Sequence, residues 1–183
     1  MKTLSVSAIR AFLPLLGLSL LSLTACKKDS ETATPAADAD GTVTWTNNGT
    51  TYTSTARSSA IVDTGDKIII TGGSDDSNNI VSLALQGINA KGAGTYDLRK
   101  GAMFADVPLA GLTLNGSNPS QATQFQTLFG PNASNGSIVV TTYDKANQKL
   151  SGTFSFTGGA IPFGTGTGTQ VVSSGSFSFT RFR

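Results

Sequence analysis

The carboxylates are the first residues in this sequence that could do chemistry, because the chain contains no histidine. Without an imidazole there is no histidine base for a catalytic triad and no histidine metal ligand. Beyond residue 40 there is no Glu, and the acidic residues are seven Asp, most of them in predicted turns. Asp97 and Asp106 lie at predicted strand ends. They are the remaining candidates for a glycosidase pair, which needs carboxyl groups roughly 5 to 9.5 Å apart.

Three other segments have residue types suited to catalysis or ion binding. The loop Gly73–Asn79 is rich in side-chain oxygens, but its spacing is not that of an EF-hand and it has no Glu, so a polar hairpin loop is favoured over a calcium site. Ser151 follows Lys149 without the S-x-x-K spacing of a Ser–Lys dyad. Gly164–Thr169 precedes neither a helix nor the Lys of a phosphate-binding loop. We therefore predict no catalytic residue, no metal ligand and no cofactor.

Tyrosines and asparagines point to binding as an alternative to catalysis. Tyr52, Tyr96 and Tyr143 lie on predicted strands, and Asn is frequent in the loops between strands. Aromatic rings and amides can stack on and hydrogen-bond to a sugar or a peptide. The simpler interpretation, which we favour, is that these tyrosines are half-buried strand residues. A glycan or a protein remains a candidate ligand, and its binding residues are unknown. Nucleic acid is not an expected partner, because no basic patch is interleaved with aromatic residues.

The first 26 residues have the organisation of a bacterial lipoprotein signal. Two basic residues precede the apolar stretch 11–23, which is too short to span a bilayer as a helix and has the length of a secretory signal core. This stretch ends in Leu23-Thr24-Ala25-Cys26, which resembles a lipobox. The resemblance implies that residues 1–25 are removed, that the Cys26 thiol receives a diacylglycerol and that its amine receives a third acyl chain. A free buried thiol is the alternative for Cys26.

Residues 26–40 predict a lipidated, flexible tether. Beyond Cys26 they include no aromatic and no branched aliphatic residue, so they cannot bury enough apolar surface to offset the entropy of ordering. The run Lys27 to Asp29 with Glu31 resembles the short charged signal that sends Bacteroidota lipoproteins to the cell surface, and a plain solvated linker is the alternative. Removal of Lys2 and Arg10 with the signal takes the 13 basic residues to 11, equal to the 11 acidic ones. The mature chain is therefore close to neutral.

Residues 41–183 predict one all-β domain. Apolar and polar residues alternate in short runs, and turn residues separate the runs. Asn48-Gly49 supplies the positive φ angles of a tight hairpin, and Ser151-Gly152 indicates a bulge. Residues 119–130 combine features of a helix and of a strand, and both alternatives stay open. The expected strands cover residues 42–46, 50–56, 59–62, 67–71, 80–85, 94–98, 102–107, 137–143, 149–157 and 175–182. About nine or ten short strands predict a single antiparallel β-sandwich or barrel.

The most distinctive segments of this domain are the hairpin Trp45–Tyr52, the strand Gly94–Tyr96, the hairpin halves Val139–Asp144 and Leu150–Phe156, and the closing Gly175–Phe177. Together they resemble a family of Bacteroidota lipoproteins of unknown function. The resemblance implies a fold and a location but no reaction, because its motifs are structural. We expect a protein that is lipid-anchored in the outer membrane, on the periplasmic face or the cell surface. Its β domain is expected to be non-catalytic and to bind a ligand or partner or to be structural. The alternative is an Asp-dependent hydrolase that acts on glycans.

Overall fold

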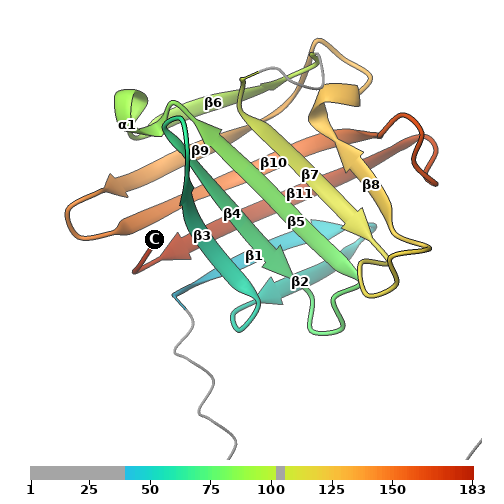
Figure 1. The fold of residues 1–183 in the computed structure, drawn as a ribbon, viewed down its shortest axis with the longest axis horizontal. Coiled ribbons are helices and arrows are strands. Elements are labelled where there is room, and N and C mark those ends of the chain that lie inside the picture. The colour runs from blue at the N-terminus through green and yellow to red at the C-terminus, as the bar shows by residue number, and fades with distance from the viewer. Residues whose placement is uncertain (1–39, 102–105) are drawn as a thin grey trace, which may run out of the picture. The chain divides into compact units, whose positions relative to one another are not determined.

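The computed structural model describes residues 40–101 and 106–183, which form an all-β domain. Eleven strands build one antiparallel sheet that curls into a nearly closed barrel (Figure 1). The predicted fold class is confirmed, and the structure is closer to the barrel than to the sandwich. Within the described ranges, the helical segments are α1, Ile88–Lys91, and the short 3-10 helix η1, Thr127–Phe129. No described helix has the length and apolar character needed to cross a membrane.

The predicted signal, Cys26 and the tether up to residue 39 lie outside the described residues. The strands follow in chain order from residue 41. They are β1 Gly41–Asn47, β2 Thr50–Ser54, β3 Ser58–Asp63, β4 Lys67–Gly73, β5 Asn79–Gln86, β6 Gly94–Arg99, β7 Leu109–Leu114, β8 Thr123–Gln126, β9 Ser134–Asp144, β10 Lys149–Ala160 and β11 Thr169–Phe179.

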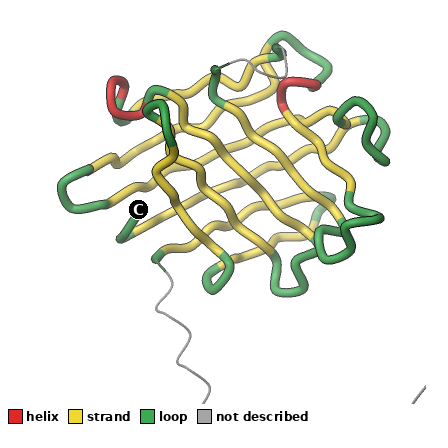
Figure 2. The backbone as a smooth tube through the Cα atoms, in the orientation of Figure 1, coloured by secondary structure: helices red, strands yellow, loops and turns green. Residues whose placement is uncertain are grey.

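The sheet folds into two crossing layers because β10 pairs with two different strands along one edge. The main path runs β2-β1-β11-β10-β8-β7-β5-β4-β3. β10 pairs with β9 over Lys149–Phe156 and then with β8 over Gly159–Ala160, while β11 occupies its other edge. Figure 1 shows β3, β4, β5, β7 and β8 in front, with β1, β2, β9, β10 and β11 crossing behind them. The loops that join the strands gather at the ends of the barrel (Figure 2).

Strict alternation along the strands places one set of apolar side chains inside the barrel. In β5, for example, Val81, Leu83 and Leu85 are fully buried and the residues between them are not. Trp45 on β1 is the largest side chain of the core and is fully buried. The core also contains Val43, Ile68, Ile70, Tyr96, Leu98, Leu112, Ile138, Leu150, Phe154, Phe156, Phe177 and Phe179. Every member of this core belongs to residues 40–183, which lie within the compact unit Ala33–Arg183.

Glycine makes room for the core phenylalanines where β10 and β11 pair. Gly175 lies opposite Phe154 in the register. A Cβ at position 175 would come within 2.5 Å of the Phe154 ring, and one at Gly152 would come within 2.6 Å of the Phe177 ring. These two positions therefore exclude larger residues for a packing reason rather than for backbone conformation.

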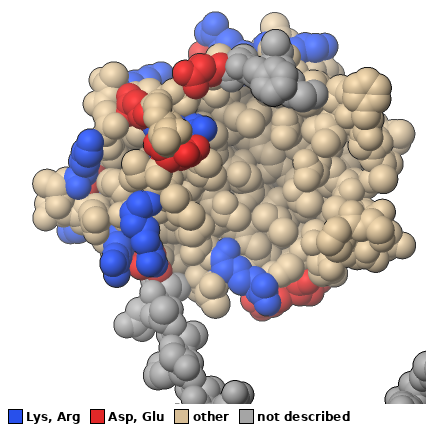
Figure 3. All heavy atoms as spheres, viewed as in Figure 1, with Lys and Arg blue, Asp and Glu red and all other residues tan. Residues whose placement is uncertain are grey.

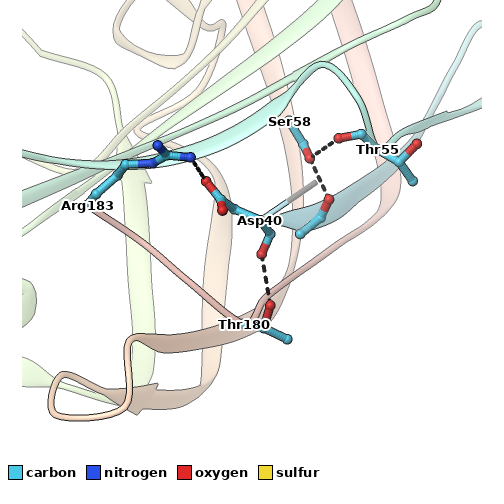
Figure 4. A network of polar contacts seen from close by, with 6 residues as sticks. Asp40, Thr55, Ser58, Thr180 and Arg183 are labelled. Carbon is cyan, nitrogen blue, oxygen red and sulfur yellow. Dashed lines mark hydrogen bonds and ion pairs between the residues drawn. The ribbon is translucent and has the colours of Figure 1, made fainter. Parts of the chain in front are cut away.

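The C-terminal tail closes the barrel beside β3. The Val62 N–H donates to the Arg183 carbonyl at 2.5 Å, and the Arg183 N–H donates to the Ala60 carbonyl at 3.1 Å. The Arg183 guanidinium also forms an ion pair with Asp40, just before β1. Thr180 donates its backbone N–H to the Asp40 carbonyl at 2.9 Å. The two ends of the described chain thus meet at the seam between β3 and β1 (Figure 4).

Two predicted strand assignments need correction. The expected strand 102–107 does not form at Asp106 and Val107, and residues 102–105 lie outside the described residues. The sequence analysis missed β7, because the outward-facing Leu109 and Gly111 are not polar and blur the alternation with the inward-facing Ala110, Leu112 and Leu114. The segment 119–130 contains the short strand β8 and the 3-10 helix η1, so neither of the two alternatives describes it alone.

The hairpin turn at Asn48-Gly49 was predicted correctly, and the bulge was predicted at the right position but on the wrong strand. Asn48 and Gly49 have φ angles of 49° and 75° in the two-residue turn between β1 and β2. The register between β9 and β10 shifts at Ser151–Gly152, and the extra residue of this bulge is Thr141 on β9. Because the bulge adds its residue to β9, the alternation along β10 is uninterrupted and both Phe154 and Phe156 face inward.

Substitution of Phe154 or Phe156 by Ala is expected to lower the free energy of unfolding by about 3 to 5 kcal/mol, because each leaves a cavity in a packed core. Chemical denaturation of each variant measures the change. Ser155→Ala is the matched control, since Ser155 lies between them and is exposed; it should change stability by less than about 0.5 kcal/mol. Wild-type stability in both Phe variants would contradict the inward orientation of these rings.

Candidate functional site

A pocket lined with asparagines opens at one end of the barrel, where three connections meet. They are the turn between β1 and β2, the loop 74–78 between β4 and β5, and the loop 115–122 between β7 and β8, toward the lower right of Figure 2. The pocket has a volume of about 270 Å³ and is lined by Tyr52, Leu114, Asp76 and five asparagines. Its lining is therefore mostly amide, with one aromatic ring and one carboxylate.

The floor of the pocket is a buried hydrogen-bond network that starts at the core tryptophan. The Trp45 indole N–H donates to Asn79 Oδ1 at 2.8 Å, and Asn79 Nδ2 donates to Asn47 Oδ1 at 3.4 Å. Asn47 Nδ2 in turn donates to Gln170 Oε1 at 3.1 Å and to the Val171 carbonyl at 3.0 Å. Asn47 and Asn79 are both buried. The network satisfies these polar groups and fixes the positions of β1, β5 and β11 beneath the pocket.

One wall of the pocket is a loop held together by the Asp76 carboxylate. Asp76 Oδ1 accepts from Ser74 Oγ at 2.5 Å and from the Asn78 N–H at 2.9 Å, and Oδ2 accepts from Asn78 Nδ2 at 3.0 Å. These hydrogen bonds, led by the one from Ser74, lower the pKa of Asp76, so the carboxylate is ionised at neutral pH. Ser117 from the β7–β8 loop hydrogen-bonds to Asn78 Oδ1 and joins the two loops.

This geometry supports the polar-loop interpretation of Gly73–Asn79 over the calcium site. Both Asp76 oxygens are engaged by the loop itself. In the described part of the chain, no group of three or more acidic or Cys side chains is arranged to hold a metal ion.

The mouth of the pocket carries hydrogen-bonding groups that have no side-chain partner among the described residues. Tyr52 is half-buried, and its ring stacks on Trp45 with 5.4 Å between ring centroids. Within residues 40–101 and 106–183, the Tyr52 hydroxyl and the Asn48 amide have no side-chain hydrogen bond. Asn115 Nδ2 makes one long contact, 3.4 Å, to the Gln121 carbonyl. A ligand in the pocket would meet the ring, its hydroxyl and two exposed amides.

The other two tyrosines fit the simpler interpretation of strand aromatics. Tyr96 is buried, its hydroxyl donates to the Gly92 carbonyl at 2.7 Å, and burial raises its pKa to about 12. The Tyr143 hydroxyl donates to Asn89 Oδ1 at 2.6 Å, and burial raises its pKa as well. Of the three candidates, Tyr52 alone lines the asparagine pocket.

The acidic candidates lie away from this pocket. Asp97 pairs with Arg99 at 3.2 Å and lines a separate hollow of about 260 Å³, together with Val107. Asp106 is exposed and is the chain neighbour of Val107, so both candidates lie near this hollow. The ion pair with Arg99 engages one Asp97 oxygen and is exposed to solvent.

The nucleophile and glycine-rich candidates have structural surroundings. Ser151 Oγ lies 3.0 Å from Thr141 Oγ at the bulge, in a hydroxyl pair rather than a Ser–Lys dyad. Gly164–Thr169 belongs to the connection between β10 and β11, and Thr169 begins β11.

The sequence analysis missed Leu114 and Asn115 as parts of a site because it missed β7. The Asn115-Gly116 dipeptide, a turn signal with Asn115 at a φ of 55°, was the available indication. The role of Asn79 could not be read from its neighbours, because its partner Trp45 lies 34 residues away.

Replacement of Asn79 by Ala is expected to lower the free energy of unfolding by about 1 to 3 kcal/mol, because it leaves the buried Trp45 N–H without an acceptor. Ser82→Ala, at an exposed position on the same strand, is the matched control and should change stability by less than about 0.5 kcal/mol. Thermal or chemical unfolding distinguishes the two. Equal stability of both variants would show that the network does not support the fold.

Comparison with known proteins gives one match. The model of the family described as "Domain of unknown function (DUF6252)" matches residues 39–182. No curated protein and no solved structure matches the chain. The matched range contains every described strand, the core and all residues of the asparagine pocket. The chain therefore belongs to the DUF6252 family.

Proposed function

We propose that this protein is a lipid-anchored bacterial protein whose non-catalytic β domain binds a ligand in the asparagine pocket. One observation carries the proposal. Three connections, distant in sequence, place an aromatic ring and unused amide and hydroxyl groups around a single concave site on a rigid floor. Binding sites typically combine this kind of concavity with a few convergent polar groups, on loops held by a rigid scaffold.

The position of the pocket suits a protein held by its N-terminus. The described chain begins at Asp40, next to the first residue of β1, and the pocket lies beyond the last residue of the same strand. Seven residues of strand span roughly 23 Å at about 3.3 Å per residue. A lipid anchor at Cys26 would precede β1 in the chain, and the pocket lies at the end of β1 opposite to the one where the chain enters the domain. The location that follows is the outer membrane, on its periplasmic face or at the cell surface.

The chemistry of the pocket favours binding over turnover. Asp76 is its one carboxylate, and hydrogen bonds from Ser74 and Asn78 already hold it in the ionised form. A general base works best with a pKa near the working pH, and a lowered pKa makes Asp76 a poor base. Since the chain has no histidine, no imidazole can take this role. The alternative, a glycan hydrolase that uses Asp97 or Asp106, would have to act at the separate hollow near β6.

Anchoring is tested at Cys26. Expression of the full chain in a bacterial host is expected to yield a mature protein that partitions into detergent and carries acyl chains, measured by phase separation and mass spectrometry. Cys26→Ser should accumulate as a precursor that is neither cut nor lipidated, because the thiol that accepts the lipid is lost. A wild-type mature protein that is water-soluble and unacylated would overturn the anchoring part of the proposal.

Binding without turnover is tested with residues 27–183, which include the whole described domain. Incubation with glycans, esters and peptides is expected to give no product, while a bound compound shifts the NMR resonances of pocket amides. Asn48→Gly is the matched variant, because it removes the amide and glycine tolerates the φ of 49° at this position. Turnover that Asp97→Asn or Asp106→Asn abolishes would favour the hydrolase and contradict the binding function.

A further inference from the structure

We infer that the ligand of the asparagine pocket is a neutral sugar: one hexopyranose ring, either free or at the end of a glycan. This inference rests on the proposed function, because it names the class of ligand for the same pocket. Four properties of the pocket lead to it: the balance of donors and acceptors, the partly exposed Tyr52 ring, the absence of cations from the lining, and the size.

The lining matches groups that both donate and accept hydrogen bonds. An Asn side chain offers two donors and a carbonyl acceptor on one planar group, and a sugar hydroxyl both donates and accepts. Asn48 and Asn115 are exposed at the mouth, each at a positive φ in a turn, while Asn47 and Asn79 are committed to the floor. The Tyr52 hydroxyl adds a donor and acceptor that has no partner in the described part of the chain. Adjacent hydroxyls on a pyranose ring could satisfy all three groups.

Tyr52 also supplies the apolar surface that a pyranose ring requires. One face of its ring is covered by Trp45, with an angle of 21° between the ring planes. Tyr52 is only half-buried and lines the pocket with Leu114, so its remaining apolar surface is available to a ligand. The C–H groups of a pyranose form an apolar patch that packs on an aromatic ring, while its hydroxyls point to the rim. A strongly charged or fully polar ligand would leave this surface unused.

The charges around the pocket disfavour anionic ligands. The residues that line it include Asp76 but no Lys or Arg. The nearby Arg57 is directed to Ser77, to which its guanidinium donates at 2.7 Å. Figure 3 shows charged side chains along the left, upper and lower margins of the viewed face, and none over the middle of the area of β7 and β8. A phosphate or a carboxylate would meet the Asp76 carboxylate without a compensating cation.

The size of the pocket limits the ligand to about one ring. Its volume of about 270 Å³ lies just below the range of about 300 to 1,000 Å³ that is usual for small-molecule sites. The three connections border the pocket, which is a local depression rather than a groove along the sheet. A terminal or isolated sugar fits this shape better than the interior of a long chain.

The test is an NMR titration of residues 27–183 with methyl glycosides of glucose, galactose, mannose and N-acetylglucosamine. At least one neutral glycoside is expected to shift the amides of Asn48, Asn79 and Asn115 at millimolar concentration. Tyr52→Phe keeps the ring and loses the hydroxyl, so it should weaken affinity about 2- to 10-fold, as for one hydrogen bond. Tyr52→Ala should weaken it more than tenfold. Thr51→Ala, at the exposed neighbouring position on β2, is the control and should bind like wild type.

Further titrations separate the failure of this inference from failure of the proposed function. Glucuronic acid and glucose 6-phosphate should bind at least tenfold more weakly than the neutral glycosides. Equal or tighter binding of these anionic sugars would overturn the inference that the ligand is neutral. If short peptides shift the pocket amides and no glycoside does, the sugar inference is wrong and the binding function stands. If neither glycosides, oligosaccharides nor peptides shift these amides, both are wrong. The affinities of a methyl glycoside and of an oligosaccharide with the same terminal residue are then compared. Tighter binding of the oligosaccharide indicates the end of a glycan, and tighter binding of the methyl glycoside indicates a free sugar.

Discussion

The hydrogen bond from the Trp45 indole to Asn79 is the constraint around which this end of the molecule is organised. Trp45 is fully buried, and an indole N–H left unpaired in a core costs about 1 to 3 kcal/mol. The acceptor comes from the first residue of β5, in the opposite layer of the barrel, and the bond therefore ties the two layers together. Asn79 then bonds to Asn47, and Asn47 bonds to β11. Because the buried Trp45 indole needs a hydrogen-bond acceptor, the core is joined to a network of amides, and this network forms the floor of the pocket.

Closure of the sheet depends on the seam between β3 and β1, where the two ends of the described chain meet. β3 would expose unpaired backbone groups along its edge if the C-terminal tail did not pair with it. Arg183 supplies both a donor and an acceptor to this edge, and the buried Phe182 stacks on Tyr143 with 5.9 Å between ring centroids. The same segment contacts Asp40, where the chain enters β1. The start of the domain is thereby held by its C-terminal segment.

The seam and the asparagine network lie at opposite ends of β1. The seam at Asp40 and Arg183 lies at the start of β1, and the asparagine network lies at the end of the same strand. In the proposed function, the anchored segment would precede the first point and the ligand would bind at the second. Family membership adds no reaction to this arrangement, because the DUF6252 family is described as a domain of unknown function. The proposed function therefore depends on the geometry of the pocket and on the lipoprotein signal predicted for the first 26 residues.

Local patterns in the sequence determined much of this protein, because a strand and a tight turn depend on near neighbours. Alternation identified most strands, Asn48-Gly49 identified its hairpin, and Ser151-Gly152 located a bulge. Cys26 and its lipobox remain a prediction from the sequence alone. The alternation failed at β7, where the outward-facing positions begin with Leu109 and Gly111 rather than with polar residues.

The pocket and the closure were decided by tertiary structure. The residues of the pocket come from three connections, and the floor joins Asn47 to Gln170, 123 positions away. No local pattern encodes such a pair, since each Asn is equally suited to a turn or a loop on its own. Only the register of the curled sheet brings these amides to one end of the barrel with Tyr52, because pairing partners distant in the chain set where each turn lies.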